Sequence, residues 1–320
     1  MKNLFLFALM AIAAISLNSC SKDELSDNSP IIQFKDPLFL KAIIDSRREE
    51  ADKNNDGQIS EKEAQQVTYL SITNSDVRNI DEIGYFTALV EFDFYNNQFT
   101  TLDVSKNTAL TTLDCSNNQL TSLDVSKNTA LSTLGCSDNQ LTSLDVSRNT
   151  ALTVLDCSRN QLTSLDVSKN TALSTLRCVG NQLASLDVSK NTALTELSCD
   201  ANQLTSLNMG KNTTLTTLDC SNNQLTSLDV NKNTALTNVN CSDNQLTSLD
   251  VSKNTALPYL DCSNNKLISL DVSKCKNLTR LVCQGNPSIQ SVVIYKYHVI
   301  AQKYLDAIIS EYGNIITYVD

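Results

Sequence analysis

The chain has 320 residues, with 25 basic and 35 acidic side chains and a formal net charge of −10. This acidic balance disfavours nucleic acid and anionic membrane surfaces as partners. With 4 prolines, 7 glycines and no tryptophan, the sequence shows no low-complexity linker beyond a short N-terminal tether, and no second globular domain.

The first residues predict export. Lys2 precedes an apolar run over residues 4–17, which is too short to favour a membrane span and has the shape of a signal-peptide core. The sequence L-N-S-C, which ends at Cys20, then resembles a bacterial lipoprotein signal. That resemblance implies that residues 1–19 are removed and that Cys20 carries the lipid. An ordinary signal peptide cleaved elsewhere is the alternative.

The segment after Cys20 bears on location. Residues 21–24, S-K-D-E, are similar to the short export signal that sends some lipoproteins to the outer face of the outer membrane. Residues 20–35 are expected to act as a tether. We therefore expect an outer-membrane protein at the cell surface that touches the membrane by its lipid anchor only, with a periplasm-facing protein as the alternative.

Residues 52–63 are the one segment with explicit metal-site chemistry. The sequence D-K-N-N-D-G-Q-I-S-E-K-E resembles an EF-hand or dockerin-type calcium loop over its whole length. Gly57 stands where such loops turn sharply. The resemblance implies that Ca²⁺ is held by Asp52, Asn54, Asp56, Gln58 through its carbonyl, Ser60 and a bidentate Glu63. An acidic turn without a bound ion is the alternative.

Helices are predicted on both sides of this loop. Asp36 and Pro37 form an N-cap and first-turn pair before an apolar stripe, and Ser60 with Glu63 can open a second helix. Calcium sensors and dockerins normally carry two such loops, whereas this chain has one. We therefore interpret residues 36–68 as a calcium-stiffened cap on the repeat region that follows.

Most of the chain is a repeat. The text L-T-x-L-x-C-x-x-N-Q-L-T-S-L-D-V-S-K-N-T-A recurs every 21 residues with small changes. Its cysteines are Cys115, Cys136, Cys157, Cys178, Cys199, Cys220, Cys241, Cys262 and Cys283. A fixed period of this length predicts a solenoid, because each unit must stack on its neighbours to bury its apolar face. Phe94 and Ile72 continue the row upstream, which gives about 11 coils and roughly 50 Å of solenoid.

The repeat resembles the leucine-rich repeat. Its pattern L-x-x-L-x-L-x-x-N-x-L is met by Leu110, Leu113, Cys115, Asn118 and Leu120. The resemblance implies one short strand per coil and a parallel sheet along residues 69–290. The second half of each unit has the same spacing, so a second row of strands or turns is expected on the opposite wall, with little room for helix.

The cysteine row is interpreted as structural. Identical inward positions on adjacent parallel strands have Cα–Cβ vectors that point the same way, which fits poorly with a disulfide. A metal site is disfavoured because no C-x-x-C pair exists and His298 is the single histidine. We predict free, buried thiols that pack as small apolar groups, with Cys275 among them.

The repeat decays after residue 287, and a cap is predicted over residues 291–320. Apolar residues along 299–312 outline an amphipathic helix, Gly313 can end it, and residues 315–319 can form a last strand. The predicted fold class is thus an α/β solenoid: strand-rich 21-residue coils with a parallel sheet, a helical N-terminal cap and a helix-strand C-terminal cap.

Catalysis finds no support in the sequence, and we predict that the protein is not an enzyme. His298 has no nucleophile motif beside it. A row of aspartates, each followed in most coils by Lys or Arg three residues later, is interpreted as a solvated, charge-balanced face. Its members are Asp103, Asp124, Asp145, Asp166, Asp187, Asp229, Asp250 and Asp271.

The coils differ from one another mainly in the cysteine half. In leucine-rich repeats this half lines the concave face, the usual recognition surface, and side chains on a rigid sheet bind with little ordering cost. The candidate ligand-binding residues are Tyr95, Arg159, Arg177, Val179, Glu196, Asp200 and Tyr259. Neutral drift at exposed positions is the alternative explanation of this variation.

Taken together, these features are similar to surface leucine-rich-repeat lipoproteins of Gram-negative anaerobes and, in their repeats, to internalins. The resemblance implies a monomeric, surface-anchored binding or adhesion protein that recognises a protein or glycan through its concave sheet. The alternative is a non-catalytic structural or scaffold protein of the cell envelope.

Overall fold

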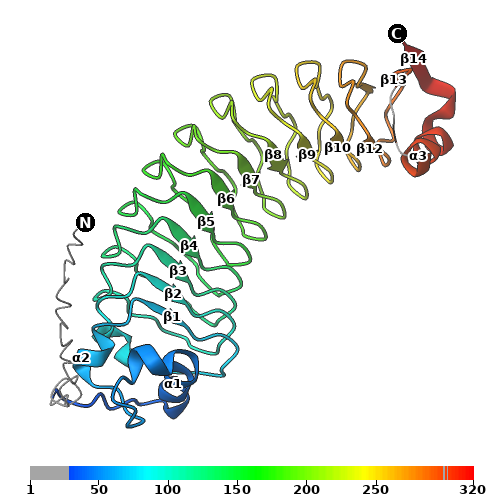
Figure 1. Cartoon of the computed structure of the whole chain (residues 1–320). Helices are drawn as coiled ribbons and strands as arrows, with labels where there is room; N and C mark the ends of the chain where they lie inside the picture. Colours follow the sequence, from blue (N-terminus) through cyan, green and yellow to red (C-terminus); the bar gives the residue numbers. More distant parts are fainter. Residues whose placement is uncertain (1–28, 298–299, 301) are drawn as a thin grey trace, which may run out of the picture.

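The computed structural model describes residues 29–297, 300 and 302–320. They form a curved solenoid of stacked coils with a helical element at each end (Figure 1). The predicted signal peptide, the lipidation site Cys20 and His298 lie outside these residues. Within the part described, helices of the length and hydrophobicity that a bilayer crossing needs are absent.

Parallel strands, one from each coil, form an eleven-stranded sheet in the order β1 to β10 and then β12. The strands are β1 (Tyr69–Ser71), β2 (Glu91–Asp93), β3 (Thr112–Asp114), β4 (Thr133–Gly135), β5 (Val154–Asp156), β6 (Thr175–Arg177), β7 (Glu196–Ser198), β8 (Thr217–Asp219), β9 (Asn238–Asn240), β10 (Tyr259–Asp261) and β12 (Arg280–Val282). Equivalent residues pair across coils, as Leu113 does with Leu134 and Leu134 with Leu155. The predicted solenoid of 21-residue coils is confirmed.

The core is a continuous stack along the inside of the coils. In the coil of β3, Leu113 in the middle of the strand and Cys115 just after it are fully buried, and Leu120 and Val125 close the core from the other half. Because strand residues alternate between the two faces of a sheet, the neighbours of Leu113 point outward. The same assignment holds in each successive coil of the sheet.

The cysteines pack in this core as predicted. All ten described cysteines are buried and free of disulfide bonds. Burial raises the pKa of their thiols, to about 11 for Cys275 and to about 12 for Cys283. Since the thiolate is the reactive form, these groups are inert apolar packing in the folded protein.

Two asparagine ladders join each coil to the one before it. In the first ladder, Asn139 donates from Nδ2 to the carbonyl of Cys115 at 3.0 Å and accepts from Leu120 N at 2.9 Å. In the second ladder, Asn128 donates to the carbonyl of Asn107 at 2.8 Å. These bonds satisfy buried backbone groups that the turns leave without a partner.

The wall opposite the main sheet consists of turns along most of its length. There, the described strand contacts are isolated bridges between Asp103 and Asp124 and between Asp187 and Asn208. Regular pairing on this wall begins near the C-terminal end, where a second parallel sheet has the order β11-β13-β14. Its strands are β11 (Ser269–Asp271), β13 (Ser291–Tyr295) and β14 (Ile316–Val319).

The aspartates in the row on this wall stabilise turns. Their main contacts are hydrogen bonds from the backbone, and the attraction of Lys or Arg is secondary. Asp124 Oδ1 accepts a hydrogen bond from Ser126 N at 2.8 Å. This bond is the main reason that the pKa of Asp124 lies below its ordinary value, and Lys127 contributes less. In the described chain no ion pair joins a row aspartate to the Lys or Arg three residues later.

Two helices and a short 3-10 helix cover the first coil. They are α1 (Pro37–Ala51), α2 (Glu61–Ala64) and η2 (Asp81–Tyr85). Phe39 on α1 is fully buried, and its ring lies edge-on to that of Phe94 with 6.2 Å between centroids. The apolar end of the stack is therefore closed by aromatic packing.

Polar bonds fix this cap in place. Asp36 accepts from Leu38 N at 2.9 Å, which caps α1, and from Arg78 N at 2.8 Å, which ties the helix start to the first coil. Ser60 and Glu63 form a reciprocal capping box at the start of α2.

The other end is closed by α3 (Gln302–Tyr312), which continues into η3 (Gly313–Ile315). The buried Tyr312 hydroxyl donates to the carbonyl of Cys283 at 3.1 Å and accepts from Asn286 N at 3.1 Å. These two bonds fasten α3 onto the last turn of the repeat.

Candidate functional site

The outward side chains of the main sheet form one surface, which we call the strand face. In each coil it comprises the first and third strand residues and the two residues that follow the buried cysteine-row residue. For the coil of β3 these are Thr112, Asp114, Ser116 and Asn117. Pairing at equal repeat positions aligns them into four rows along the solenoid.

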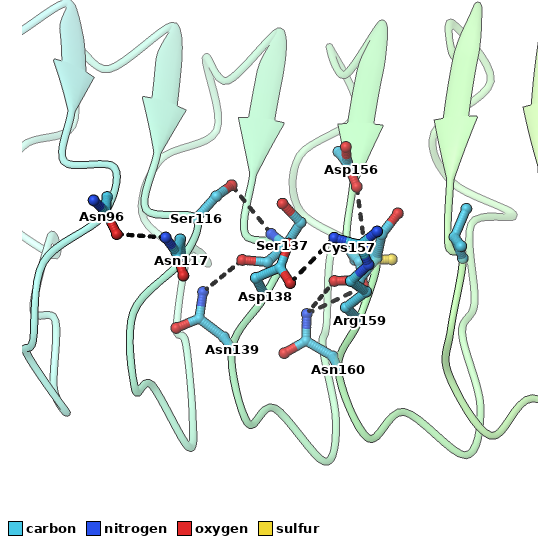
Figure 2. A network of polar contacts seen from close by, with 12 residues as sticks. Asn96, Ser116, Asn117, Ser137, Asp138, Asn139, Asp156, Cys157, Arg159 and Asn160 are labelled. Carbon is cyan, nitrogen blue, oxygen red and sulfur yellow. Dashed lines mark hydrogen bonds and ion pairs between the residues drawn. The ribbon is translucent and has the colours of Figure 1, made fainter. Parts of the chain in front are cut away.

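The seven residues predicted for ligand binding all belong to the strand face, but to different rows. Arg177 ends β6, Glu196 begins β7 and Tyr259 begins β10. One residue after the cysteine row come Tyr95, Val179 and Asp200. Arg159 lies one residue further on, in a turn where its φ is +50° (Figure 2). Arg159 and Arg177 are thus on neighbouring coils but in different rows.

Both arginines are paired with carboxylates. Arg177 donates from Nε and Nη2 to the two carboxylate oxygens of Glu196, at 2.8 and 3.1 Å. Arg159 Nη1 lies 3.5 Å from Asp138 Oδ1 on the preceding coil (Figure 2). The two-pronged contact of Arg177 fixes both side chains across adjacent strands. The centre of the strand face therefore presents neutralised pairs and no unpaired cation at these two positions.

Several variable outward residues also hold the backbone, a role that was not predicted from the sequence. Asp114 Oδ1 accepts from Ser116 N at 2.9 Å, and Asp219 and Asp261 make the equivalent bond at 3.0 Å each. The signal is readable in the sequence as an Asp two residues before a Ser, the spacing of an Asx turn. Part of the variation between coils therefore maintains the bend at the end of the strand.

Two aspartates on adjacent coils, Asp200 and Asp219, influence each other on the strand face. Asp200 is half-buried, and this burial, together with the charge of Asp219, raises its pKa to about 6. Asp219 Oδ2 accepts a hydrogen bond from Asn240 Nδ2 at 3.0 Å. The two carboxylates thus interact across adjacent coils, and one of them holds its proton more tightly than an ordinary aspartate.

An aromatic and cationic stack lies at the end of the same face. The Arg280 guanidinium is 4.5 Å from the ring centroid of Tyr259 and 5.2 Å from that of Tyr304. Tyr259 also donates weakly to Asp261 Oδ2, at 3.5 Å. Tyr304 belongs to α3, outside the repeat, so the spacing of the repeat gave no indication of this contact. Stacked Arg and Tyr are favoured at binding surfaces.

In the predicted calcium loop, two carboxylates accept hydrogen bonds from backbone amides. The nearly buried Asp52 accepts from Asp56 N and Gly57 N, each at 3.0 Å. The nearly buried Glu63 accepts from Ser60 N and Lys53 N, each at 2.9 Å. Gly57 has a φ of +80°, as the sharp turn requires.

The donor chemistry of this loop fits Ca²⁺. It consists of oxygen atoms, and Asn54 Nδ2 also bonds Asp56 Oδ2 at 3.0 Å, so the first three predicted ligands lie in one cluster. The described residues nevertheless contain no group of three or more His, Cys, Asp or Glu side chains arranged around a common point as a metal site. The carboxylates are held on backbone amides, and Gln58 donates its own N–H to Asp56 Oδ1 at 2.8 Å.

Comparison with known proteins agrees with the repeat geometry. Sequence profiles for leucine-rich repeats match residues 108–149, as two copies, and residues 214–232. The functional domain of InlJ from Listeria monocytogenes, described as including a cysteine ladder, is 41% identical with a TM-score of 0.70, over 76% of this chain and 56% of that one. The chain therefore has the leucine-rich-repeat solenoid fold. It spans little more than half of the InlJ domain that it matches.

Two further structures share the fold at lower identity. The internalin InlF from Listeria monocytogenes is 20% identical with a TM-score of 0.60, covering 90% of this chain and 95% of that one. The Leptospira interrogans leucine-rich-repeat protein LIC12759 is 22% identical with a TM-score of 0.60, covering 81% and 73%. None of the curated proteins matches the sequence. No catalytic family is indicated by these comparisons.

The raised pKa of Asp200 predicts a pH-dependent effect of Asp200→Asn on stability. In the folded chain this carboxyl has a pKa of about 6, against an ordinary value of 3.8, so the folded state binds the proton more tightly than the unfolded state. The wild type should therefore lose stability as pH rises from 3.8 through 6. The variant lacks this loss and should unfold at higher denaturant concentration than the wild type above that range.

Asp166→Asn is the matched control. Hydrogen bonds from Ser168 lower the pKa of Asp166, so this variant should lose the stability that the wild type has at neutral pH. The test is to measure the denaturant midpoints of the wild type and both variants across the pH range. An Asp200→Asn midpoint that follows the wild-type curve at every pH would refute the assignment.

Proposed function

We propose that this protein is a surface-anchored adhesion or binding protein that recognises a protein or glycan with its strand face. The main observation that supports this proposal is the contrast in sequence variation between the two halves of each coil. The second half is nearly constant, whereas the third strand residue changes from coil to coil. Along β3 to β10 and β12 it is Asp114, Gly135, Asp156, Arg177, Ser198, Asp219, Asn240, Asp261 and Val282.

The construction of the face supports this proposal. Its side chains stand on short strands whose backbone is fixed on both sides by neighbouring coils, so a ligand needs to order little of the protein. Tyr95 is 43% exposed and projects near the N-terminal end, while the Tyr259–Arg280 stack lies near the C-terminal end. Exposed Tyr and Arg are the side chains that most often anchor a partner.

A scaffold of the cell envelope is the second candidate, and one observation favours it. Three outward side chains form hydrogen bonds within the protein: Glu196, Arg177 and Asp219. If every outward residue had such a task, the variation would reflect packing of neighbouring coils. Screening the protein on glycan and surface-protein arrays separates the two candidates, because a scaffold gives no saturable ligand.

A bulky side chain on the strand face should block binding. Ser198 is the partly exposed third residue of β7, and none of its side-chain atoms makes a hydrogen bond shown in the structure. Ser198→Trp should weaken binding to the best array ligand by more than about tenfold, or 1.4 kcal/mol. The measurement is a titration of wild type and variant with that ligand.

The control is the same substitution at Ser185, which is exposed on the second half of a neighbouring coil. Ser185→Trp should leave affinity within twofold, and both variants should keep the wild-type thermal midpoint because both side chains face solvent. Equal losses of binding in the two variants would place the ligand elsewhere than on the strand face.

The anchoring of the protein rests on its first residues, and we propose that Cys20 is lipidated and holds the protein at the outer membrane. Cys20→Ser removes the acceptor of the lipid and should abolish incorporation of labelled fatty acid. Surface exposure is tested by protease treatment of intact cells. Labelling that persists in Cys20→Ser would rule out this anchor.

We propose further that the loop of residues 52–63 binds Ca²⁺ and stiffens the N-terminal cap. Asp52, Asn54, Asp56, Ser60 and Glu63 would supply oxygen ligands, together with the carbonyl of Gln58. Supporting this proposal, two of these carboxylates are nearly buried, where an unneutralised charge is costly. Binding to the folded form alone would stabilise the cap by about 2.7 kcal/mol at a hundredfold excess over Kd.

Glu63→Gln should lower the calcium affinity by at least about tenfold, since it removes the bidentate charge. The amide oxygen can still accept the bond from Ser60 N, whereas the bond from Lys53 N is lost, so the apo variant should fold with a less stable cap and an intact repeat. Glu61→Gln, which removes a charge from the same loop outside the ligand set, is the control. Calorimetric titration that shows no calcium binding to the wild type, or equal affinity in both variants, would refute the assignment.

A further inference from the structure

The two sheets differ in how their edges are covered. In the main sheet, the edge strand β1 lies against α1 and the edge strand β12 lies against α3 (Figure 1). A covered edge is not available for pairing with another chain. In the second sheet, β14 (Ile316–Val319) is an edge strand, and all four of its residues are partly or fully exposed. Within the part of the chain described, β13 is its one strand partner, so the other side of β14 is an open edge.

The backbone of β14 has unused hydrogen-bonding groups on this edge. Lys296 N donates to the carbonyl of Val319 at 2.8 Å, so the main-chain groups of Val319, and of Thr317 two residues before it, point toward β13. Because this direction alternates along a strand, the N–H and C=O groups of Ile316 and Tyr318 point to the open side. They have no backbone partner among the described residues.

The side chains of β14 are also incompletely covered. Tyr318 pairs in register with the buried Ile294 and therefore lies on the core side of the sheet, yet it is 51% exposed. Ile316 pairs with the buried Val292 and is likewise only partly covered. Both side chains stay in contact with solvent because no described strand follows β14 in the sheet. Residues 316–319 contain neither a charge nor a proline, the usual means of preventing an edge strand from pairing.

This edge is complementary to itself. When two copies of β14 run antiparallel about a two-fold axis at Thr317, the outward groups of Ile316 in one copy meet those of Tyr318 in the other, and the two residues exchange both hydrogen bonds. Thr317 then lies opposite Thr317, and Ile315 opposite Val319. Thr–Thr pairs and pairs of an aromatic with a β-branched residue are among those that stabilise antiparallel strands.

The distribution of charge favours contact at this end of the molecule. The whole chain carries −10, whereas residues 291–320 carry −1, from two lysines and three acidic residues. One of these acids, Asp320, already forms an ion pair with Lys296. Two copies of an acidic protein therefore repel each other least at their C-terminal caps.

We propose that this protein forms a two-fold dimer in which β14 of one copy pairs antiparallel with β14 of a second copy, centred on Thr317. The two three-stranded sheets then join into one continuous sheet across the dimer. Residues of the strand face belong to the other sheet, so both strand faces stay accessible and the inference does not depend on their ligand. The monomer that the sequence resemblance implies is the alternative.

Disulfide trapping tests the pairing and its register. In the proposed dimer the two Thr317 residues form a non-hydrogen-bonded pair with Cα atoms about 4.5 Å apart, which is within the range of a disulfide. Thr317→Cys in the full chain should therefore give a covalent dimer on mild oxidation, seen on a non-reducing gel. The described native cysteines are buried, and the wild type oxidised in parallel gives the background from all native cysteines.

Two further cysteine variants are the controls. Val319→Cys lies on the same side of the same strand, but in the proposed register it is roughly 14 Å from its copy. Thr121→Cys is exposed on the repeat, away from β14. Both should give no more covalent dimer than the wild type. Equal cross-linking of Thr317→Cys and Val319→Cys would reflect random collision and would overturn the proposal.

Charge substitutions at the same position give an independent measurement. Light scattering of the full chain in detergent micelles, corrected for bound detergent, should show a protein dimer. Thr317→Lys places like charges opposite each other and should weaken dimerisation at least about tenfold, and an equimolar mixture with Thr317→Glu should restore it. Thr121→Lys, the matched control, should leave the dimer unchanged. A wild type that is monomeric at every concentration, or a dimer that Thr317→Lys leaves intact, would contradict the proposal.

Discussion

The whole solenoid depends on hydrogen bonds from buried asparagine amides to the preceding coil. Each 21-residue turn leaves carbonyl groups inside the stack, where a missing partner costs about 1–3 kcal/mol. Asn107 donates to the carbonyls of Ile83 and Phe86, at 3.0 and 2.8 Å, so the ladder of the second half starts at the end of η2 in the first coil. Every later rung of this ladder likewise rests on the coil before it, so the coils are hydrogen-bonded into one continuous structure.

The fold was predictable because its signals repeat. The 21-residue period, the inward cysteine row and the aromatic substitutions at Phe94 all pointed to stacked strands, and the Asp36–Pro37 pair marked the first helix correctly. The Arg177–Glu196 contact was missed, although the third residue of one strand and the first of the next stand 19 residues apart at every step. The contact between Lys35 and Glu82 joins the cap to the first coil across 47 residues, so the 21-residue spacing could not have revealed it.

Some outward side chains of the strand face also stabilise the backbone. The differences between coils at these positions therefore do not all reflect ligand binding. Asp114 and Asp261 vary in the row that also contains Gly135 and Val282, yet each aspartate bonds the backbone of its own turn. Variation in that row is therefore partly conformational. The first strand residue carries no such bond in most coils, and neither does Ser198 in the third row. The recognition that we propose then rests on fewer positions than the sequence variation suggests.

The turn that leaves the strand face passes through a left-handed residue in successive coils, with φ of +53° at Asn117, +51° at Asp138 and +50° at Arg159. Gly, Asn and Asp adopt this conformation at least cost and make up most of the row, whereas Arg159 and Ala201 are its costly members. The first strand position has no such restriction and already carries Val154 and Tyr259. Substitutions at the first strand position can thus change the chemistry of the strand face while the backbone conformation stays the same.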